Sequence, residues 1–117
     1  MLRANELLSQ IKVLEGILSD KLPLSSEIKA TIDDKFRLEF NYNSNHIEGN
    51  TLTYGEAELF LKFDKIEGGH DYRDYQEMEA HNVALLMVER EAYDKERPLT
   101  ENFIRTLNET LLVKPYW

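Results

Sequence analysis

The chain has 117 residues, of which 42% are hydrophobic and 31% are charged, and it contains no cysteine. This length and balance indicate one soluble globular domain or a part of one, while the lack of cysteine excludes disulfides, thiol catalysis and cysteine-ligated metals. The net charge of −8, from 22 acidic and 14 basic residues, argues against a nucleic-acid partner, because binding a phosphate backbone requires a basic surface.

The sequence also lacks targeting signals. No run approaches the roughly 18 consecutive apolar residues that a membrane span requires. Residues 1–6 do not show the basic-then-apolar pattern of a secretory signal. We therefore expect a cytoplasmic protein with no membrane partner.

The first predicted element is a helix over residues 2–19. Its apolar stripe consists of residues that recur at three- and four-residue steps: Leu7, Ile11, Leu14 and Leu18. Two heptads are too few to indicate a coiled coil, so we expect this stripe to pack against neighbouring helices. We treat residues 1–24 as an N-terminal helix and linker, and residues 25–117 as the domain that follows.

The second predicted helix begins at an N-cap supplied by Ser25 or Ser26 and runs to about Glu48. Helix propensity alone would end it near Phe40, but Ile47 stays in phase with the preceding apolar residues, and Gly49 provides a left-handed stop. We expect its buried face to contain the apolar residues Ile28, Ile32, Phe36, Phe40 and Ile47, with Leu38 and Tyr42 widening it.

Three more helices follow in the prediction. Thr53 and Glu56 form a capping box that opens a helix to about Phe63, and the next helix covers residues 71–93. Its six-residue apolar run at 83–88 predicts burial nearly all round, as in a central helix. Thr100 caps the last helix, which ends before Pro115. The expected buried residues of the third and fifth helices are Leu59, Phe60, Phe63, Phe103, Ile104, Leu107 and Leu111.

The fold class predicted from these elements is all-α, with about five helices. The only strand candidate, residues 111–113, is better interpreted as a helix end. The chain finishes on Tyr116 and Trp117, whereas termini are usually polar. We interpret this as a cut through a larger domain; the alternative is a natural terminus whose aromatic side chains pack into the core.

The run from Ser44 to Asn50 is the strongest candidate for a functional site. Ser44 and Glu48 are four residues apart and so share one helix face. Glu48 lies at the negative end of the helix dipole, which disfavours an acid by roughly 0.3–1 kcal/mol. It therefore needs a cationic partner. Asn41, Asn43 and Asn45 either support this site or belong to a solvated face, and His46 is expected at the surface.

Residues 44–53 read Ser-Asn-His-Ile-Glu-Gly-Asn-Thr-Leu-Thr, which resembles the inhibitory-helix motif of Fic proteins, (S/T)xxxE(G/N). Ser44, Glu48 and Gly49 match its three defined positions. The family follows the motif with a capped helix, then a helix with an acid and an asparagine three apart, matched by Glu79 and Asn82, and then a turn and another helix. The resemblance covers roughly residues 36–112 and implies the N-terminal portion of a Fic-type helical domain.

The resemblance implies a protein adenylyltransferase, which transfers AMP from ATP, with Mg²⁺, to a hydroxyl of a target protein. In that family the glutamate matched by Glu48 pairs with an arginine of the catalytic loop and displaces the γ-phosphate of ATP. Ser44 would line the same site. The family's catalytic motif, HxFx(D/E)GN(G/K)R, does not occur in this sequence. We therefore expect no catalytic residue here, no tightly bound ATP or Mg²⁺, and no activity of this chain alone.

Two functions remain open from the sequence. The first is the auto-inhibitory N-terminal part of a Fic-type enzyme, whose partners are its C-terminal catalytic half and a target protein. The second is a non-enzymatic helical interaction module, such as an antitoxin-like partner that inhibits a separate Fic chain. An exposed apolar face and self-association are expected if the chain is cut. No metal site is expected, because Asp74, Glu77 and His81 do not form the paired Glu-x-x-His pattern of a di-iron bundle.

Overall fold

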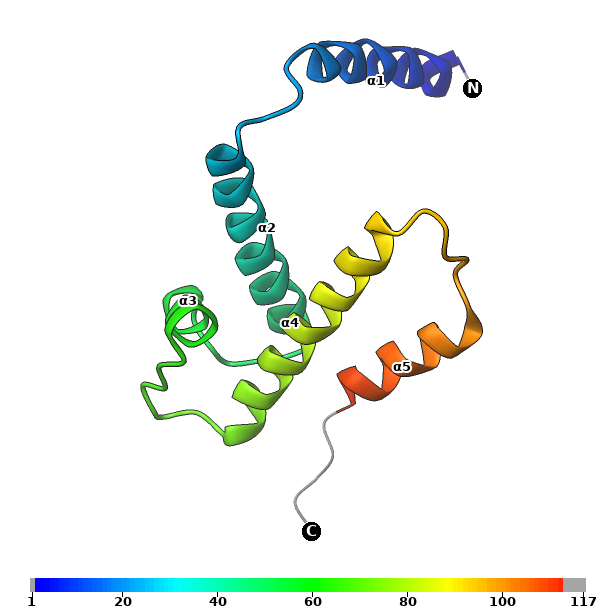
Figure 1. Ribbon diagram of the computed structural model, residues 1–117. Helices are drawn as coiled ribbons and strands as arrows, with labels where there is room; N and C mark the ends of the chain where they lie inside the picture. The colour runs from blue at the N-terminus through cyan, green and yellow to red at the C-terminus, as the bar shows by residue number, and fades with distance from the viewer. Residues whose placement is uncertain (1, 113–117) are drawn as a thin grey trace. The chain divides into compact units, whose positions relative to one another are not determined.

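The computed structural model describes the backbone of residues 2–112 and the side chains of residues 3–112. These residues form five α-helices and no strand, so the all-α prediction is confirmed (Figure 1). The helices are α1 (Leu2–Asp20), α2 (Ser26–Ile47), α3 (Tyr54–Phe63), α4 (Tyr72–Tyr93) and α5 (Glu101–Leu111). Val113, Tyr116 and Trp117, on which the interpretation of the chain end depends, lie outside the described residues.

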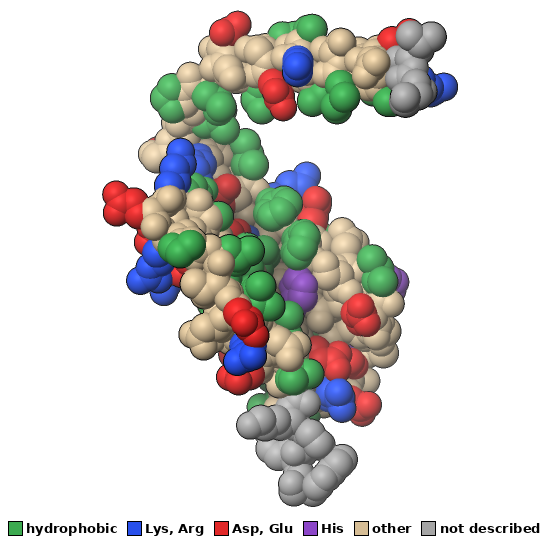
Figure 2. All heavy atoms as spheres, turned by 90° about the vertical axis from the view of Figure 1, so that its right-hand side faces the viewer, with side chains coloured by type: hydrophobic (Ala, Val, Ile, Leu, Met, Phe, Trp, Pro, Cys, Tyr) green, Lys and Arg blue, Asp and Glu red, His purple; other side chains and the backbone are tan. Residues whose placement is uncertain are grey.

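The chain divides into two compact units, residues 1–33 and residues 34–117, and the division falls within α2. The boundary predicted between residues 24 and 25 stays a prediction. In the first unit, the apolar stripe of α1 is exposed: its members are Leu7, Ile11, Leu14 and Leu18. Figure 2 shows hydrophobic side chains at the surface of this helix, at the top of the view. No described helix is both long and apolar enough to cross a membrane.

The predicted starts of α2, α3 and α5 are confirmed by capping hydrogen bonds. Ser25 Oγ accepts from the backbone N–H of Ile28 at 3.3 Å, and Thr100 Oγ1 accepts from that of Phe103 at 3.1 Å. At α3 the capping box is complete, because Thr53 Oγ1 accepts from the N–H of Glu56 at 3.2 Å and Glu56 Oε1 accepts from the N–H of Thr53 at 3.0 Å. These bonds satisfy backbone donors that a helix start leaves unpaired.

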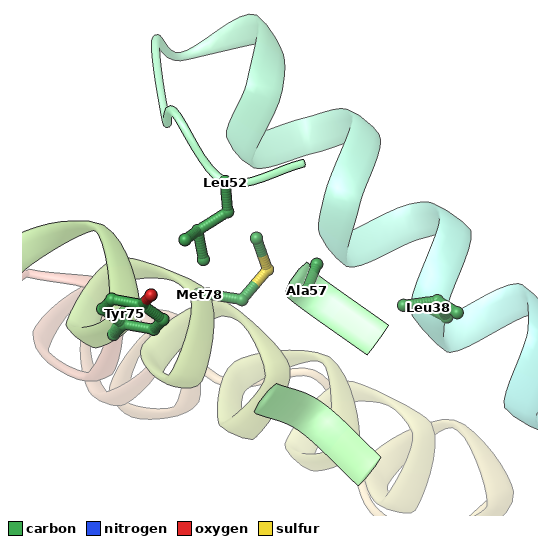
Figure 3. Close-up of a cluster of buried hydrophobic side chains, with 5 residues drawn as sticks. All are labelled: Leu38, Leu52, Ala57, Tyr75 and Met78. Atoms are coloured by element: carbon green, nitrogen blue, oxygen red, sulfur yellow. The ribbon is translucent and has the colours of Figure 1, made fainter. Parts of the chain in front are cut away.

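The core lies in the second unit, where α4 packs against α3 and α5 (Figure 1). Its buried hydrophobic residues are Leu38, Leu52, Ala57, Tyr75 and Met78. Leu52 and Met78 point toward one another beside Ala57 (Figure 3). Leu52 precedes the N-cap of α3 and packs in the same cluster as Ala57, four positions into the helix. This is the geometry of a hydrophobic staple, and it fixes where the chain enters α3.

The predicted buried face of α2 is wrong for its five main apolar residues. Phe36 is 53% exposed, Phe40 is 43% exposed and Ile47 is 82% exposed, and Ile28 and Ile32 in the first unit are exposed as well. The helix buries Leu38, as predicted, together with Asn41 and Asn45, and Tyr42 is half-buried against the core. At 3.6 residues per turn the three buried residues lie roughly on the opposite side from Phe36, Phe40 and Ile47.

Burial on the later helices also differs from the prediction. Helix α4 is not buried all round, since Val83, Leu86 and Val88 are each at least 40% exposed. Phe63 at the end of α3 is 70% exposed. In α5 no residue is fully buried, although Phe103 and Leu107 are half-buried. An apolar stripe shows which face of a helix is suited to packing, but the described residues do not provide a neighbour for every stripe.

Candidate functional site

Helix α2 ends in a complete Schellman motif at the predicted glycine stop. Gly49 has a φ of 95°, and its N–H donates to the carbonyl of His46 at 3.0 Å. The N–H of Asn50 donates to the carbonyl of Asn45, also at 3.0 Å. A positive φ at this position favours glycine because it has no Cβ. Glu48 is consequently held as the C-cap, one residue beyond Ile47, the last helical residue.

The C-terminal end of α2 opens onto a cleft of about 440 Å³ in the second unit. Three helices contribute to its walls: Ser44, Asn45 and Glu48 come from α2, Arg73, Glu77 and His81 from α4, and Leu111 and Leu112 from the end of α5. The structure thus places Ser44 and Glu48, which the sequence had put on one face, in the same cleft. Ser44 is half-buried and Glu48 is exposed.

Not every charged side chain that lines this cleft has a partner of opposite charge. Arg73 Nε donates to Glu77 Oε1 at 2.8 Å, which pairs one guanidinium with one carboxylate. The carboxylate of Glu48 forms no hydrogen bond or ion pair with any of residues 3–112. With neutral His81 the lining therefore carries one unbalanced negative charge, at the end of a helix whose dipole also disfavours it.

A buried asparagine network joins α2 to α4 behind this cleft. Asn41 is completely buried, and its Nδ2 donates to Asn82 Oδ1 at 2.8 Å. The other amide atom, Oδ1, lies 2.6 Å from His81 Nδ1. Asn45, 6% exposed, donates through Nδ2 to the backbone carbonyl of Asn41 at 2.8 Å. Each of these bonds requires a particular donor and acceptor at hydrogen-bonding distance, so the network fixes α2 and α4 relative to one another.

This network also sets the state of the His81 ring. A carbonyl oxygen can only accept a hydrogen bond, so Nδ1 of His81 carries the hydrogen that Asn41 Oδ1 accepts. Burial lowers the pKa of His81 below its usual value of about 6.5. At neutral pH the ring is therefore neutral, with a lone pair at Nε2.

A second network holds the segment that follows Gly49. Asn50 Nδ2 donates to the backbone carbonyl of Asp74 at 2.8 Å. The hydroxyl of Thr51 donates to Asp74 Oδ2 at 2.5 Å and lies 2.8 Å from His70 Nδ1. The other ring nitrogen of His70, Nε2, is 2.5 Å from Glu56 Oε2. The turn after Glu48 is thereby tied both to the start of α3 and to the first turn of α4.

Glu56 has a lowered pKa in this second network. The main cause is the hydrogen bond that its carboxylate accepts from the backbone N–H of Thr53, followed by the bond with the Thr53 hydroxyl. His70 contributes less. Each interaction favours the ionised carboxylate, so Glu56 stays charged to a lower pH than an ordinary glutamate.

The sequence left open whether Asn41, Asn43 and Asn45 support this site or belong to a solvated face. Asn41 and Asn45 are buried supports, whereas Asn43 and His46 are exposed; the surface prediction for His46 is confirmed. One signal was available, because Leu38, Asn41 and Asn45 recur at three- and four-residue steps and so share a face. No such signal identified His81 as a wall of the cleft. Among the described side chains, no group of three or more His, Asp or Glu could hold a metal ion.

The fold and the cleft define an all-α domain with an unpaired carboxylate at a helix C-terminus. No family model matches the chain, and no curated protein does. Among solved structures, the chain is similar to a Fic domain-containing signaling protein from Bacteroides thetaiotaomicron, with a TM-score of 0.86 and 56% sequence identity. The match covers 92% of this chain and 40% of that protein. This similarity supports the Fic family for the chain, which spans 40% of the relative's length.

Proposed function

We propose that this chain is the auto-inhibitory N-terminal part of a Fic-type protein adenylyltransferase. In the whole protein, a hydroxyl oxygen of a target protein attacks the α-phosphorus of ATP and gives its proton to a base in the catalytic part. The bond from that phosphorus to the pyrophosphate breaks, and AMP stays on the target. Glu48 restrains this reaction by binding an arginine of the catalytic part, which lies outside this chain.

The observation that carries the proposal is the unpaired Glu48 carboxylate in a preformed cleft. Arg73 is the only described cation that lines this cleft, and it is already bonded to Glu77. A guanidinium from outside these residues could bind the carboxylate through two parallel hydrogen bonds. It would also offset the unfavourable helix dipole at this position.

The nucleotide and its metal would be held mainly by the remainder of the enzyme. The described residues offer no cluster of metal-ligating side chains, so they do not fit a Mg²⁺ site by themselves. Exposed apolar residues on α4 and α5, such as Val83 and Ile104, are suited to contact that remainder. In its absence the same surfaces would favour self-association of the chain.

The proposal is tested by self-modification of the full-length protein with labelled ATP. Glu48→Gly should raise the labelling rate roughly 10- to 100-fold, the equivalent of a charge-assisted hydrogen bond of about 1.5–3 kcal/mol. Glu48→Gln should act in the same direction, because it removes the charge and keeps the size of the side chain.

Asp20→Asn is the matched control. Asp20 is an exposed acid and the last residue of α1, so its replacement relieves a comparable dipole penalty without touching the cleft. Its labelling rate should equal that of the wild type. Equal labelling by the wild type and both Glu48 variants, in a protein that is catalytically active, would exclude the inhibitory role.

A further inference from the structure

We propose that His81 is a positioning residue of the same cleft, whose Nε2 accepts a second hydrogen bond from the guanidinium that Glu48 binds. The inference rests on the proposed function, because it concerns the partner of Glu48. It adds a residue from α4 that the inhibitory motif does not contain. It also makes the strength of inhibition depend on pH.

The geometry leaves one ring atom of His81 available to the cleft. Nδ1 is bonded to Asn41 Oδ1 at 2.6 Å, and no other described residue is hydrogen-bonded to the ring. The ring also packs against that of Phe40, with centroids 5.6 Å apart and an angle of 31° between the planes. Since Asn41 is completely buried, both contacts hold the ring in one orientation.

The remaining groups of the cleft do not compete with His81 for this role. Glu48 faces it from α2, while Arg73 and Glu77 lie on α4 and are bonded to each other. Among the described residues at the end of α5 and just after it, only Leu111 and Leu112 line the cleft. A guanidinium has five N–H donors, and a carboxylate bound side-on uses two of them. A neutral imidazole lone pair in the same cleft as Glu48 can accept a third.

Protonation of His81 reverses this contribution. The protonated ring carries a hydrogen on Nε2, so it can no longer accept a bond there, and its positive charge repels a guanidinium. Burial keeps the ring neutral at neutral pH by lowering its pKa, and a bound guanidinium would extend the neutral range further. Inhibition should therefore weaken as the pH falls through the lowered pKa of His81.

The test is the ratio of self-labelling rates of Glu48→Gly and the otherwise wild-type full-length protein, measured from about pH 7.5 to about pH 5.5. Taking this ratio removes the pH dependence of the chemical step, which both proteins share. We expect the ratio to fall as the pH is lowered over this range, by at most about tenfold, the loss expected for one hydrogen bond to a charged group. In a His81→Gln background the ratio should stay constant, because glutamine does not titrate.

His46→Gln is the matched control, because His46 is an exposed histidine that stacks on Tyr42 outside the cleft lining. Its ratio should fall with pH as the wild-type ratio does. A ratio that is large at pH 7.5 and unchanged at pH 5.5 would overturn the role of His81 and leave the proposed function intact. A ratio of one at pH 7.5 would overturn both. The pH dependence of the ratio in the otherwise wild-type protein tests the role of His81 even if His81→Gln does not fold.

Discussion

Replacing Asn41 by alanine is the most direct test of the network that connects α2 to α4. The side chain is 0% exposed, and its loss removes the bond to Asn82 Oδ1 at 2.8 Å and the bond from His81 Nδ1 at 2.6 Å. Each half-buried partner left without a bond costs about 1–3 kcal/mol. Because both partners retain partial access to water, we take about 1 kcal/mol each and add about 1 kcal/mol for the cavity.

The expected cost of Asn41→Ala is therefore about 3 kcal/mol, a large fraction of the roughly 5–15 kcal/mol that stabilises a typical domain. Urea unfolding followed by the helical circular dichroism signal measures it, provided that the m-value is unchanged. Asn43→Ala is the matched control, because Asn43 lies two residues further along the helix and is exposed. Both variants gain the same helix propensity from alanine. If the free energies of unfolding of the two variants differ by less than about 0.5 kcal/mol, the network does not stabilise the fold.

Two further predictions concern the ends of helices. Gly49→Ala should destabilise the chain by about 1 kcal/mol, because φ is 95° there, whereas Gly55→Ala inside α3 should stabilise it by about 0.5–1 kcal/mol. Neither added Cβ meets another atom within 4 Å, so any difference between the two variants comes from the backbone conformation. We expect the two melting temperatures to shift in opposite directions, and shifts of equal sign would contradict this explanation. Because the pKa of Glu56 is lowered, its ionised carboxylate stabilises the folded state. This contribution to folding stability is fully present above the usual glutamate pKa and disappears as the pH falls through the lowered value. Glu56→Gln should accordingly be less stable than the wild type at about pH 7 and equally stable at about pH 2, and a difference that persists in acid would argue against this linkage.

Helix boundaries were predictable because their signals are local. Ser25, Thr53 and Thr100 each accept a hydrogen bond from an N–H three residues later, and Gly49 closes α2 through bonds that span at most five residues. Such contacts depend only on neighbouring sequence. This explains why α2 ends within one residue of the predicted position although its last turns are rich in asparagine.

Burial was not predictable in the same way, because it depends on which distant element covers a face. The stripe containing Phe36 and Phe40 has a regular helical period, yet both residues are exposed. Asn41 is buried because Asn82 and His81, about 40 residues away in sequence, provide its partners. Hydrophobicity alone ranks asparagine as a surface residue, and only the tertiary partners reverse that ranking.

The asparagine network has a consequence for how Glu48 could bind a cation. A hydrophobic contact between α2 and α4 would tolerate small shifts in register, whereas the Asn41 amide requires both of its partners at hydrogen-bonding distance. The bonds of Asn50 and Thr51 to Asp74 impose the same requirement on the turn that follows Glu48. These bonds therefore fix the α2 and α4 walls of the cleft relative to one another, and a guanidinium that binds there does not have to order them. A weakly solvated cation could then bind at this helix end with little loss of conformational entropy in these two walls.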